Sequence, residues 1–212
     1  SILLKSKYGA DSTVIDIETE GRAFIFNNEE DSLAIVDGFN IINGYVEDEN
    51  ENVQGGAIFI DNANPTIKNC IFSQNKAVKG GAIYLKQSSS LLENLTLETN
   101  FASQGHAIYI DHLSNIKLID SNINTHFNLV GYYGSTIIIS NESSAIFSRN
   151  IISNNQGSTG TAVNVSSSSL IADNCLFAEN GHSTGSNSIQ CNYSTCEFYH
   201  CTIVNSFDHS NY

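Results

Sequence analysis

Short segments of this chain alternate apolar and polar residues and recur at nearly constant intervals. Each segment starts at Gly or Ser and is apolar at its fourth and sixth positions, while the fifth position varies. The segments start at Gly21, Gly55, Gly80, Gly105, Gly134, Gly160 and Ser186, at spacings of 34, 25, 25, 29, 26 and 26 residues. A period of two with one constantly apolar face predicts a strand in each segment.

The aligned segments form columns of apolar positions that we expect to build the core. The fourth-position column contains Ile58, Ile83, Ile108, Ile137, Val163 and Ile189, and the sixth-position column contains Ile60, Leu85, Ile110, Ile139 and Val165. A further column contains Phe72, Leu97, Ile123, Ile152, Phe177 and Ile203. Because the columns lengthen in the same places, the extra residues belong to loops in single turns.

A repeat of this length, with several short strands and no helical period, predicts an all-β fold. It fits a single-stranded parallel β-helix, a solenoid of about seven coils with about 25 residues per coil. We expect one domain over residues 1–212, with 1–20 as an irregular first coil or a segment leading into the coils, and 21–206 as regular coils. Residues 198–207 still have a core pattern without a polar cap. The stack is therefore expected to continue in a longer chain or to associate end to end with another molecule.

Two polar columns lie at the expected turns. One contains Asn75, Asn100, His126, Asn155 and Asn180, and the other contains Asn69, Asn94, Asp120 and Asn174. Asn tolerates left-handed backbone angles, and its amide can bond to the same group one coil away. We interpret both columns as structural ladders, with a sugar-binding amide row as the alternative.

The five cysteines show no zinc-binding spacing. Cys191 and Cys196 are the pair expected to form a disulfide in an oxidising compartment. Cys175 and Cys201 fall in adjacent coils and are close enough to touch, although such cysteines are more often small core residues. Cys70 lies four coils from Cys175, too far for a bridge.

The repeats resemble those of known families. GGAI tetrapeptides at Gly55–Ile58 and Gly80–Ile83, and FxxN tetrapeptides at Phe72–Asn75 and Phe177–Asn180, resemble the paired repeats of the polymorphic outer-membrane protein family. The coils also look like those of pectin-lyase-like β-helices. The resemblance covers about residues 20–206 and implies a right-handed β-helix in a secreted or surface-displayed protein, commonly an adhesin.

Charge and hydropathy limit the partners. The chain has 9 Lys and Arg against 22 Asp and Glu, a net charge of -13. Repulsion of polyanions therefore argues against nucleic-acid binding. No uncharged apolar run approaches the roughly 18 residues that span a bilayer, so no membrane-spanning segment is expected.

Two carboxylates are the candidate catalytic residues. Asp61, Lys86 and Asp111 occupy one outward column in successive coils, and Asp61 and Asp111 are separated by a distance compatible with glycoside hydrolysis. The intervening lysine favours a simpler interpretation, a ladder of ion pairs between strands. A lyase is disfavoured because Arg22 and Arg149 are the only arginines and lie far apart in the stack.

Two weaker site hypotheses concern metal and modification. Glu47, Asp48, Glu49 and Glu51 form an acidic insertion that could bind calcium, with a solvated charged loop as the favoured alternative. Asn164, Asn192, Asn141 and Asn94 each open a glycosylation acceptor triplet, and we rank Asn164 above Asn94 because it lies on an outward strand position. No cofactor is expected.

Together these observations predict a non-catalytic scaffold that is extracellular or at the cell surface. We expect it to be adhesin-like or filament-forming and to bind a glycan or a surface protein through its outward strand face and loops. The alternative is a carbohydrate-active enzyme, a polysaccharide hydrolase or lyase of the pectin-lyase-like class.

Overall fold

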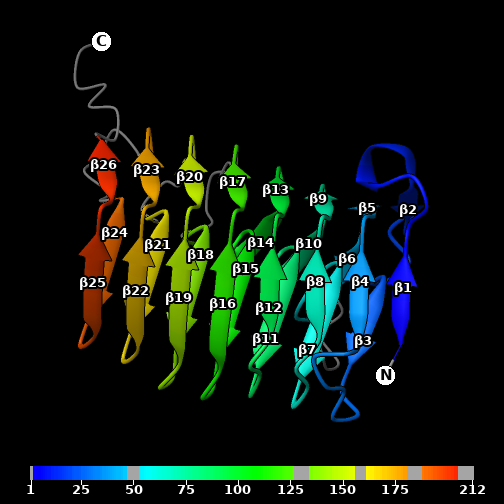
Figure 1. Ribbon diagram of the computed structural model, residues 1–212, viewed down its shortest axis with the longest axis horizontal. Coiled ribbons are helices and arrows are strands. Elements are labelled where there is room, and N and C mark those ends of the chain that lie inside the picture. The colour runs from blue at the N-terminus through cyan, green and yellow to red at the C-terminus, as the bar shows by residue number, and fades with distance from the viewer. Residues whose placement is uncertain (1, 47–52, 127–133, 156–160, 181–187, 205–212) are drawn as a thin grey trace.

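The strands of this protein stack side by side from one end of a rod to the other. The computed structural model describes residues 2–46, 53–126, 134–155, 161–180 and 188–204, and the arrangements below concern these residues. Figure 1 shows the N-terminal and C-terminal coils at opposite ends of the long axis. Nearly all of the structure is parallel β, so the predicted fold class is confirmed.

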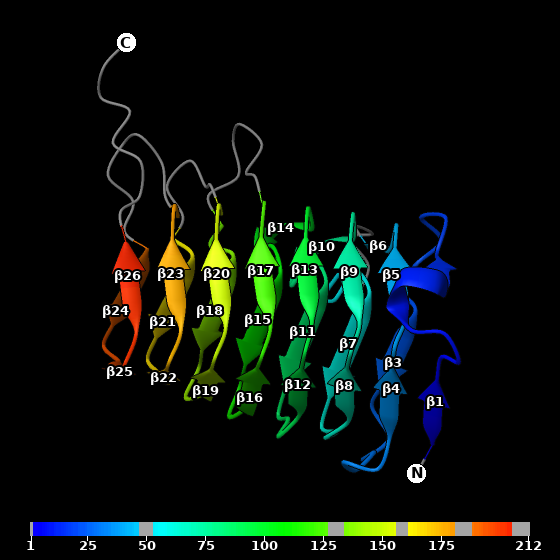
Figure 2. The same ribbon diagram turned by 45° about the horizontal axis from the view of Figure 1, so that its top comes forward.

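Three long sheets run along the rod, and every strand pair in them is parallel. Sheet A contains β1 (Leu3–Lys5), β4 (Ile35–Asp37), β8 (Thr66–Lys68), β12 (Leu91–Glu93), β16 (Asn115–Ile119), β19 (Ser144–Ser148), β22 (Ser169–Asp173) and β25 (Thr195–Tyr199). Sheet B, which is turned toward the viewer in Figure 2, contains β2 (Val14–Asp16), β5 (Asn40–Ile42), β9 (Ile71–Ser73), β13 (Thr96–Glu98), β17 (Asn122–Asn124), β20 (Ile151–Ser153), β23 (Leu176–Ala178) and β26 (Thr202–Val204).

Sheet C closes each turn of the solenoid before the chain returns to sheet A. It contains β3 (Phe24–Phe26), β7 (Ile58–Asp61), β11 (Ile83–Lys86), β15 (Ile108–Asp111), β18 (Ile137–Ser140), β21 (Val163–Ser166) and β24 (Ile189–Asn192). A short sheet D lies between sheets B and C along the chain, with strands β6 (Tyr45–Val46), β10 (Lys76–Lys79) and β14 (Phe101–Gln104). The sequence pattern did not predict sheet D.

The core consists of the apolar columns, stacked in register. Ile83 pairs with Ile58 on one side and with Ile108 on the other, and all three side chains are fully buried. Phe72, Leu97, Ile123, Ile152 and Phe177 are also fully buried. Each such side chain contributes roughly 1.5–3 kcal/mol to stability through the hydrophobic effect.

The last residue of the Phe72 column differs from the others in burial. Ile203 pairs with Phe177 as the column requires, yet it is 52% exposed. No described coil lies beyond β26 to cover it. Pairing in register therefore does not ensure burial, because a core side chain is fully buried only where a coil covers it on each side.

The N-terminal segment is more regular than its sequence suggests. Residues 3–5 and 14–16 form β1 and β2, which pair in register with β4 and β5. Only the short 3-10 helix η1 (Ala10–Ser12) interrupts them. The segment therefore supplies strands to sheets A and B, although it lacks the glycine that marks the later repeats.

The two polar columns occupy turns, and one of them is a buried ladder. Asn75, Asn100, His126, Asn155 and Asn180 are at most 2% exposed. Asn75 Nδ2 donates to Asn100 Oδ1 over 2.9 Å, and Asn155 Nδ2 donates to Asn180 Oδ1 over 3.0 Å. These amides bond to one another and to backbone carbonyls, so they are not presented to a ligand. The other column, Asn69, Asn94, Asp120 and Asn174, has φ between 50° and 54°, as its turn requires.

One disulfide is present among the described residues, between Cys191 and Cys196. Cys70 and Cys175 are buried free thiols, and Cys201 is a half-buried one. Within the described ranges no helix is long and apolar enough to cross a membrane.

Candidate functional site

Sheet C carries a row of aromatic side chains on its outward face. Phe59, Tyr84 and Tyr109 alternate with the core residues of β7, β11 and β15, and successive ring centroids are 5.7 Å apart. All three residues are only 4–6% exposed. Lys79 Nζ lies 5.0 Å from the Tyr109 ring, and the Arg22 guanidinium lies 5.3 Å from the Phe59 ring. Because the row is covered, it is not an open platform on which a sugar ring can stack.

The predicted acidic column runs beside this row, at the carboxyl ends of the same strands. Lys86 is in register with Asp61 and with Asp111, so the three side chains form one column as expected. Lys86 Nζ lies 3.1 Å from Asp61 Oδ2, and this pair is about one-third exposed. The alternating ladder is thus formed on the Asp61 side, whereas Asp111 has other partners.

Asp111 is the centre of a hydrogen-bond network. Its side chain is 4% exposed, and Tyr84 Oη donates to its Oδ2 over 2.7 Å. Its Oδ1 accepts from Asn141 Nδ2 over 2.5 Å and from Ser140 Oγ over 3.3 Å. The backbone N and the Nδ1 of His112 lie 3.0 Å and 2.9 Å from the same Asp111 Oδ1.

The network keeps Asp111 ionised. Burial raises the pKa of Asp111, but the hydrogen bonds from Asn141, Tyr84 and His112 outweigh burial and hold the pKa below its ordinary value. Conversely, burial, the bond to Asp111 and the negative charge of Asp111 raise the pKa of Tyr84. A glycosidase acid needs a raised pKa, so Asp111 is a poor proton donor.

His112 is a candidate general base that the sequence pattern did not single out. Its side chain is 57% exposed, and the Asp111 carboxylate fixes its Nδ1. A histidine oriented in this way by a carboxylate can act as a general base through its other ring nitrogen. The Asp-His dipeptide directly after a predicted strand was the available signal. Among the described residues, Asp111 is the only hydrogen-bond or ion-pair partner of His112 that could take part in catalysis.

The four glycosylation candidates have different surroundings. Asn94 and Asn141 are exposed, but their amide nitrogens donate to Asn69 Oδ1 and Asp111 Oδ1. Asn164 is half-buried, and its Oδ1 is buried without a hydrogen-bond partner. Asn192 is half-buried and accepts a long bond of 3.5 Å from Gln190. The ranking of these residues stays a prediction.

The acidic insertion of Glu47, Asp48, Glu49 and Glu51 is the weak calcium-site candidate of the sequence. These four residues lie outside the described part of the chain. Within the described part, no three His, Cys, Asp or Glu side chains are grouped to hold a metal ion.

The stacked parallel sheets and the buried columns define a class of protein, the parallel β-helix solenoid. Residues 56–211 match the protein family described as the right-handed beta helix region. The chain belongs to this family, and its solenoid is right-handed. Searches of curated proteins and of solved structures returned no match.

Proposed function

We propose that this protein is a non-catalytic β-helix scaffold at the cell surface or outside the cell, where it binds a glycan or a surface protein. One observation carries the proposal: the charged side chains at the carboxyl ends of β7, β11 and β15 in sheet C are held by partners within the protein. Asp61 pairs with Lys86, and Asp111 receives hydrogen bonds from four side chains. Such a face is built for rigidity, which leaves the turns and exposed strand positions to contact a ligand.

The proposed location has separate support. Disulfides persist in oxidising compartments, and Cys191 and Cys196 form one. The net charge of -13 favours solubility and repels polyanions. The resemblance to surface-displayed β-helix repeats points to the same location.

Both ends of the described rod support a filament-forming role. At the N-terminal end, Leu4, Phe24 and Phe26 line a largely apolar cavity of about 510 Å³. At the C-terminal end, Ile203 and Val204 are about half exposed. Either further coils of a longer chain or a second copy stacked head to tail would cover such surfaces, and the head-to-tail contact propagates into a filament unless it closes into a ring.

The alternative function, carbohydrate cleavage, is favoured only by the Asp111–His112 pair. We would incubate the protein with neutral and anionic polysaccharides, assay for new reducing ends and unsaturated products, and measure binding to the same panel. We expect binding without turnover, and assemblies larger than a monomer in sedimentation velocity.

Substitutions of the candidate catalytic residues decide between the scaffold and the enzyme. Turnover that is lost in Asp61→Asn, Asp111→Asn or His112→Gln would establish the enzyme and overturn the scaffold. Lys117→Gln is the matched control because Lys117 is an exposed residue of sheet A, away from this face.

A further inference from the structure

Cys175 and Cys201 lie one above the other in adjacent coils, at the turn between sheets A and B. The backbone bonds around them fix this register: Asn174 N donates to Tyr199 O, and Thr202 N donates to Cys175 O, each over 2.9 Å. The pairing of Leu176 with Thr202 continues it into β23 and β26. The two cysteines are therefore equivalent positions of consecutive coils.

The side chains of both residues approach each other at the edge of the core. Cys175 belongs to the buried core cluster, and Cys201 packs against that cluster. Cys201 Sγ lies 3.3 Å from Ala172 O, in the coil that carries Cys175. Burial raises the pKa of the Cys175 thiol, and the neighbouring Cys201 thiol raises it further, as expected for two side chains that lie close together.

The spacing of adjacent coils meets the Cα-separation requirement for a disulfide. Neighbouring strands are about 4.8 Å apart, within the range of about 4.4–6.8 Å that separates the Cα atoms of bridged cysteines. Cys70, the other free thiol, occupies the same column further toward the N-terminus. The next coil places Leu95 above it, because Thr96 N donates to Cys70 O. Cys70 therefore has no cysteine to pair with and serves as an internal control.

We propose that Cys175 and Cys201 form a second disulfide when the folded protein meets an oxidant such as a small-molecule disulfide. Cys201 is half-buried, so its thiolate attacks the small disulfide first, forms a mixed disulfide and releases one small thiol. The Cys175 thiolate then attacks the Cys201 sulfur and releases the second small thiol. One protein S–S bond forms as one small-molecule S–S bond breaks, and the protons of the two cysteine thiols end on the two released thiols.

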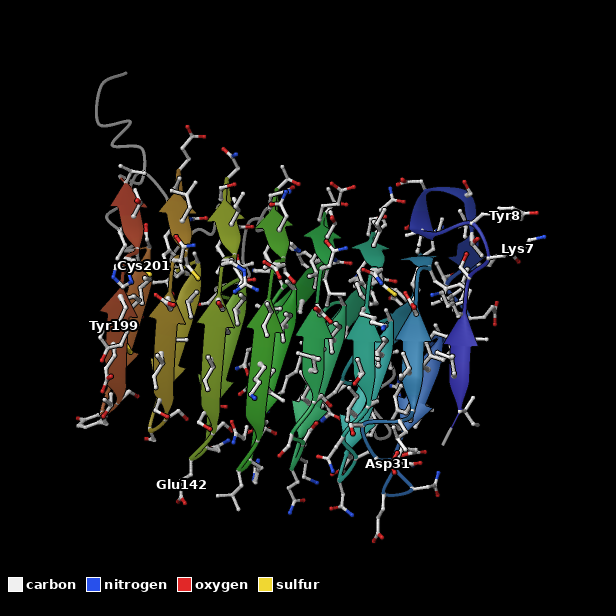
Figure 3. The ribbon with its side chains drawn as sticks, in the orientation of Figure 1. Lys7, Tyr8, Asp31, Glu142, Tyr199 and Cys201 are labelled. Carbon is white, nitrogen blue, oxygen red and sulfur yellow. A yellow bond between two sulfur atoms is a disulfide. The ribbon has the colours of Figure 1, made fainter. Side chains whose placement is uncertain are left out.

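The bond would fasten the last described coil to the coil before it. Figure 3 shows Cys201 beside Tyr199 at the C-terminal end of the rod, opposite Lys7 and Tyr8. Cys201 directly precedes β26, whose three residues are all exposed. The Cys191–Cys196 disulfide closes a loop within one coil, whereas this disulfide would join two coils and restrain the fraying of an open sheet edge.

Oxidised glutathione is the test reagent. We would add it to the folded protein under mildly alkaline conditions, quench with acid, count thiols in denaturant and map the linked peptides by mass spectrometry. The count should fall from three free thiols to one, with Cys175 linked to Cys201 and Cys70 still free. Amide exchange of β26 should slow in the oxidised sample.

The variants Cys175→Ser and Cys201→Ser separate the steps. Cys175→Ser should stop at a glutathione adduct on Cys201, and Cys201→Ser should keep both remaining thiols. The proposal is overturned if the wild type keeps three thiols, ends as a stable glutathione adduct, or links Cys201 to Cys196. These results do not depend on whether the protein binds a glycan, so they are separable from the proposed scaffold function.

Discussion

The N-terminal half of the rod (residues 34–111, β4 to β15) and the C-terminal half (residues 115–204, β16 to β26) build the same core with different turns. In the N-terminal half, sheet D runs beside paired glycines. A Cβ on Gly56 would lie 2.2 Å from Gly81 O and 2.7 Å from Lys76 O of β10, and a Cβ on Gly81 would lie 2.2 Å from His106 O. In the C-terminal half, Ser135 and Thr161 occupy the position of Gly56 and Gly81.

The comparison explains the glycine pairs physically. The first glycine of each pair, Gly55 or Gly80, has φ near 65°, which L-residues rarely adopt. The second lies where a sheet D strand approaches too closely for a side chain. Where the described part of the following coil contains no sheet D strand, the second position holds a side chain, in His106, Ser135 and Thr161, and Ser135 Oγ and Thr161 Oγ1 bond to each other over 3.1 Å. The GGAI motif thus identifies sheet D in addition to the strand that follows it.

The outward row of sheet C changes at the same boundary. Phe59, Tyr84 and Tyr109 in the N-terminal half are followed by Ile138, Asn164 and Gln190 in the C-terminal half. The aromatic part is covered, whereas Gln190 is exposed. We therefore expect the N-terminal half to be the more rigid part of this face.

The largest predicted effect is a loss of folding stability in acid. It arises from two buried histidines at the boundary between the halves. Burial lowers the pKa of His106 to about 4 and that of His126 to about 3. In the unfolded chain both titrate near their ordinary value of 6.5, so the unfolded state binds protons first as the pH falls. Stability is therefore full above about pH 6.5 and declines toward pH 4, by on the order of 2 kcal/mol per imidazole at pH 5.

Urea unfolding at pH 7 and pH 5 measures this effect. Asp37 and Asp111 have lowered pKa values, and their contribution to stability falls mainly below this window. His126→Asn is the informative variant because it restores the amide found elsewhere in the buried ladder. It should remove about half of the loss, and unfolding midpoints that agree at both pH values in the wild type would contradict the prediction.

Gly81→Ala tests the role of sheet D and should have the next largest effect. The added methyl group would meet the backbone oxygens of His106 and Phe101 at 2.2 and 2.6 Å, so the backbone must move. We expect a loss of about 3 kcal/mol in the free energy of unfolding. Ser135→Ala, at the same repeat position in the other half, loses hydroxyl hydrogen bonds and should cost about 1 kcal/mol. Equal losses in chemical denaturation would show that sheet D does not impose the glycine.

The core was predictable from sequence because a period of two, repeated at a fixed step, determines both register and face. Ile58, Ile83 and Ile108 needed no other information. Sheet D lacks such a pattern, because Lys76–Lys79 and Phe101–Gln104 share few residue types. The hydrogen bonds of Asp111 were not predictable from the sequence pattern either. Ser140 and Asn141 reach it from the next coil, where the repeat alignment places Ser140 beside Asp111, but the spacing does not show which side chains turn toward the carboxylate.

The smallest predicted effects on stability distinguish the Asp61 end of the acidic column from its Asp111 end. The sequence pattern had predicted one uniform ladder of ion pairs along this column. Tyr84→Phe removes a donor from the buried Asp111 carboxylate and should cost about 2 kcal/mol, because a buried charge loses a charge-assisted bond. Asp61→Asn breaks a partly exposed ion pair and should cost less than about 1 kcal/mol. Urea unfolding of both variants at pH 7 makes the comparison. A larger loss for Asp61→Asn would mean that the Lys86 ladder, and not the Asp111 network, stabilises this face.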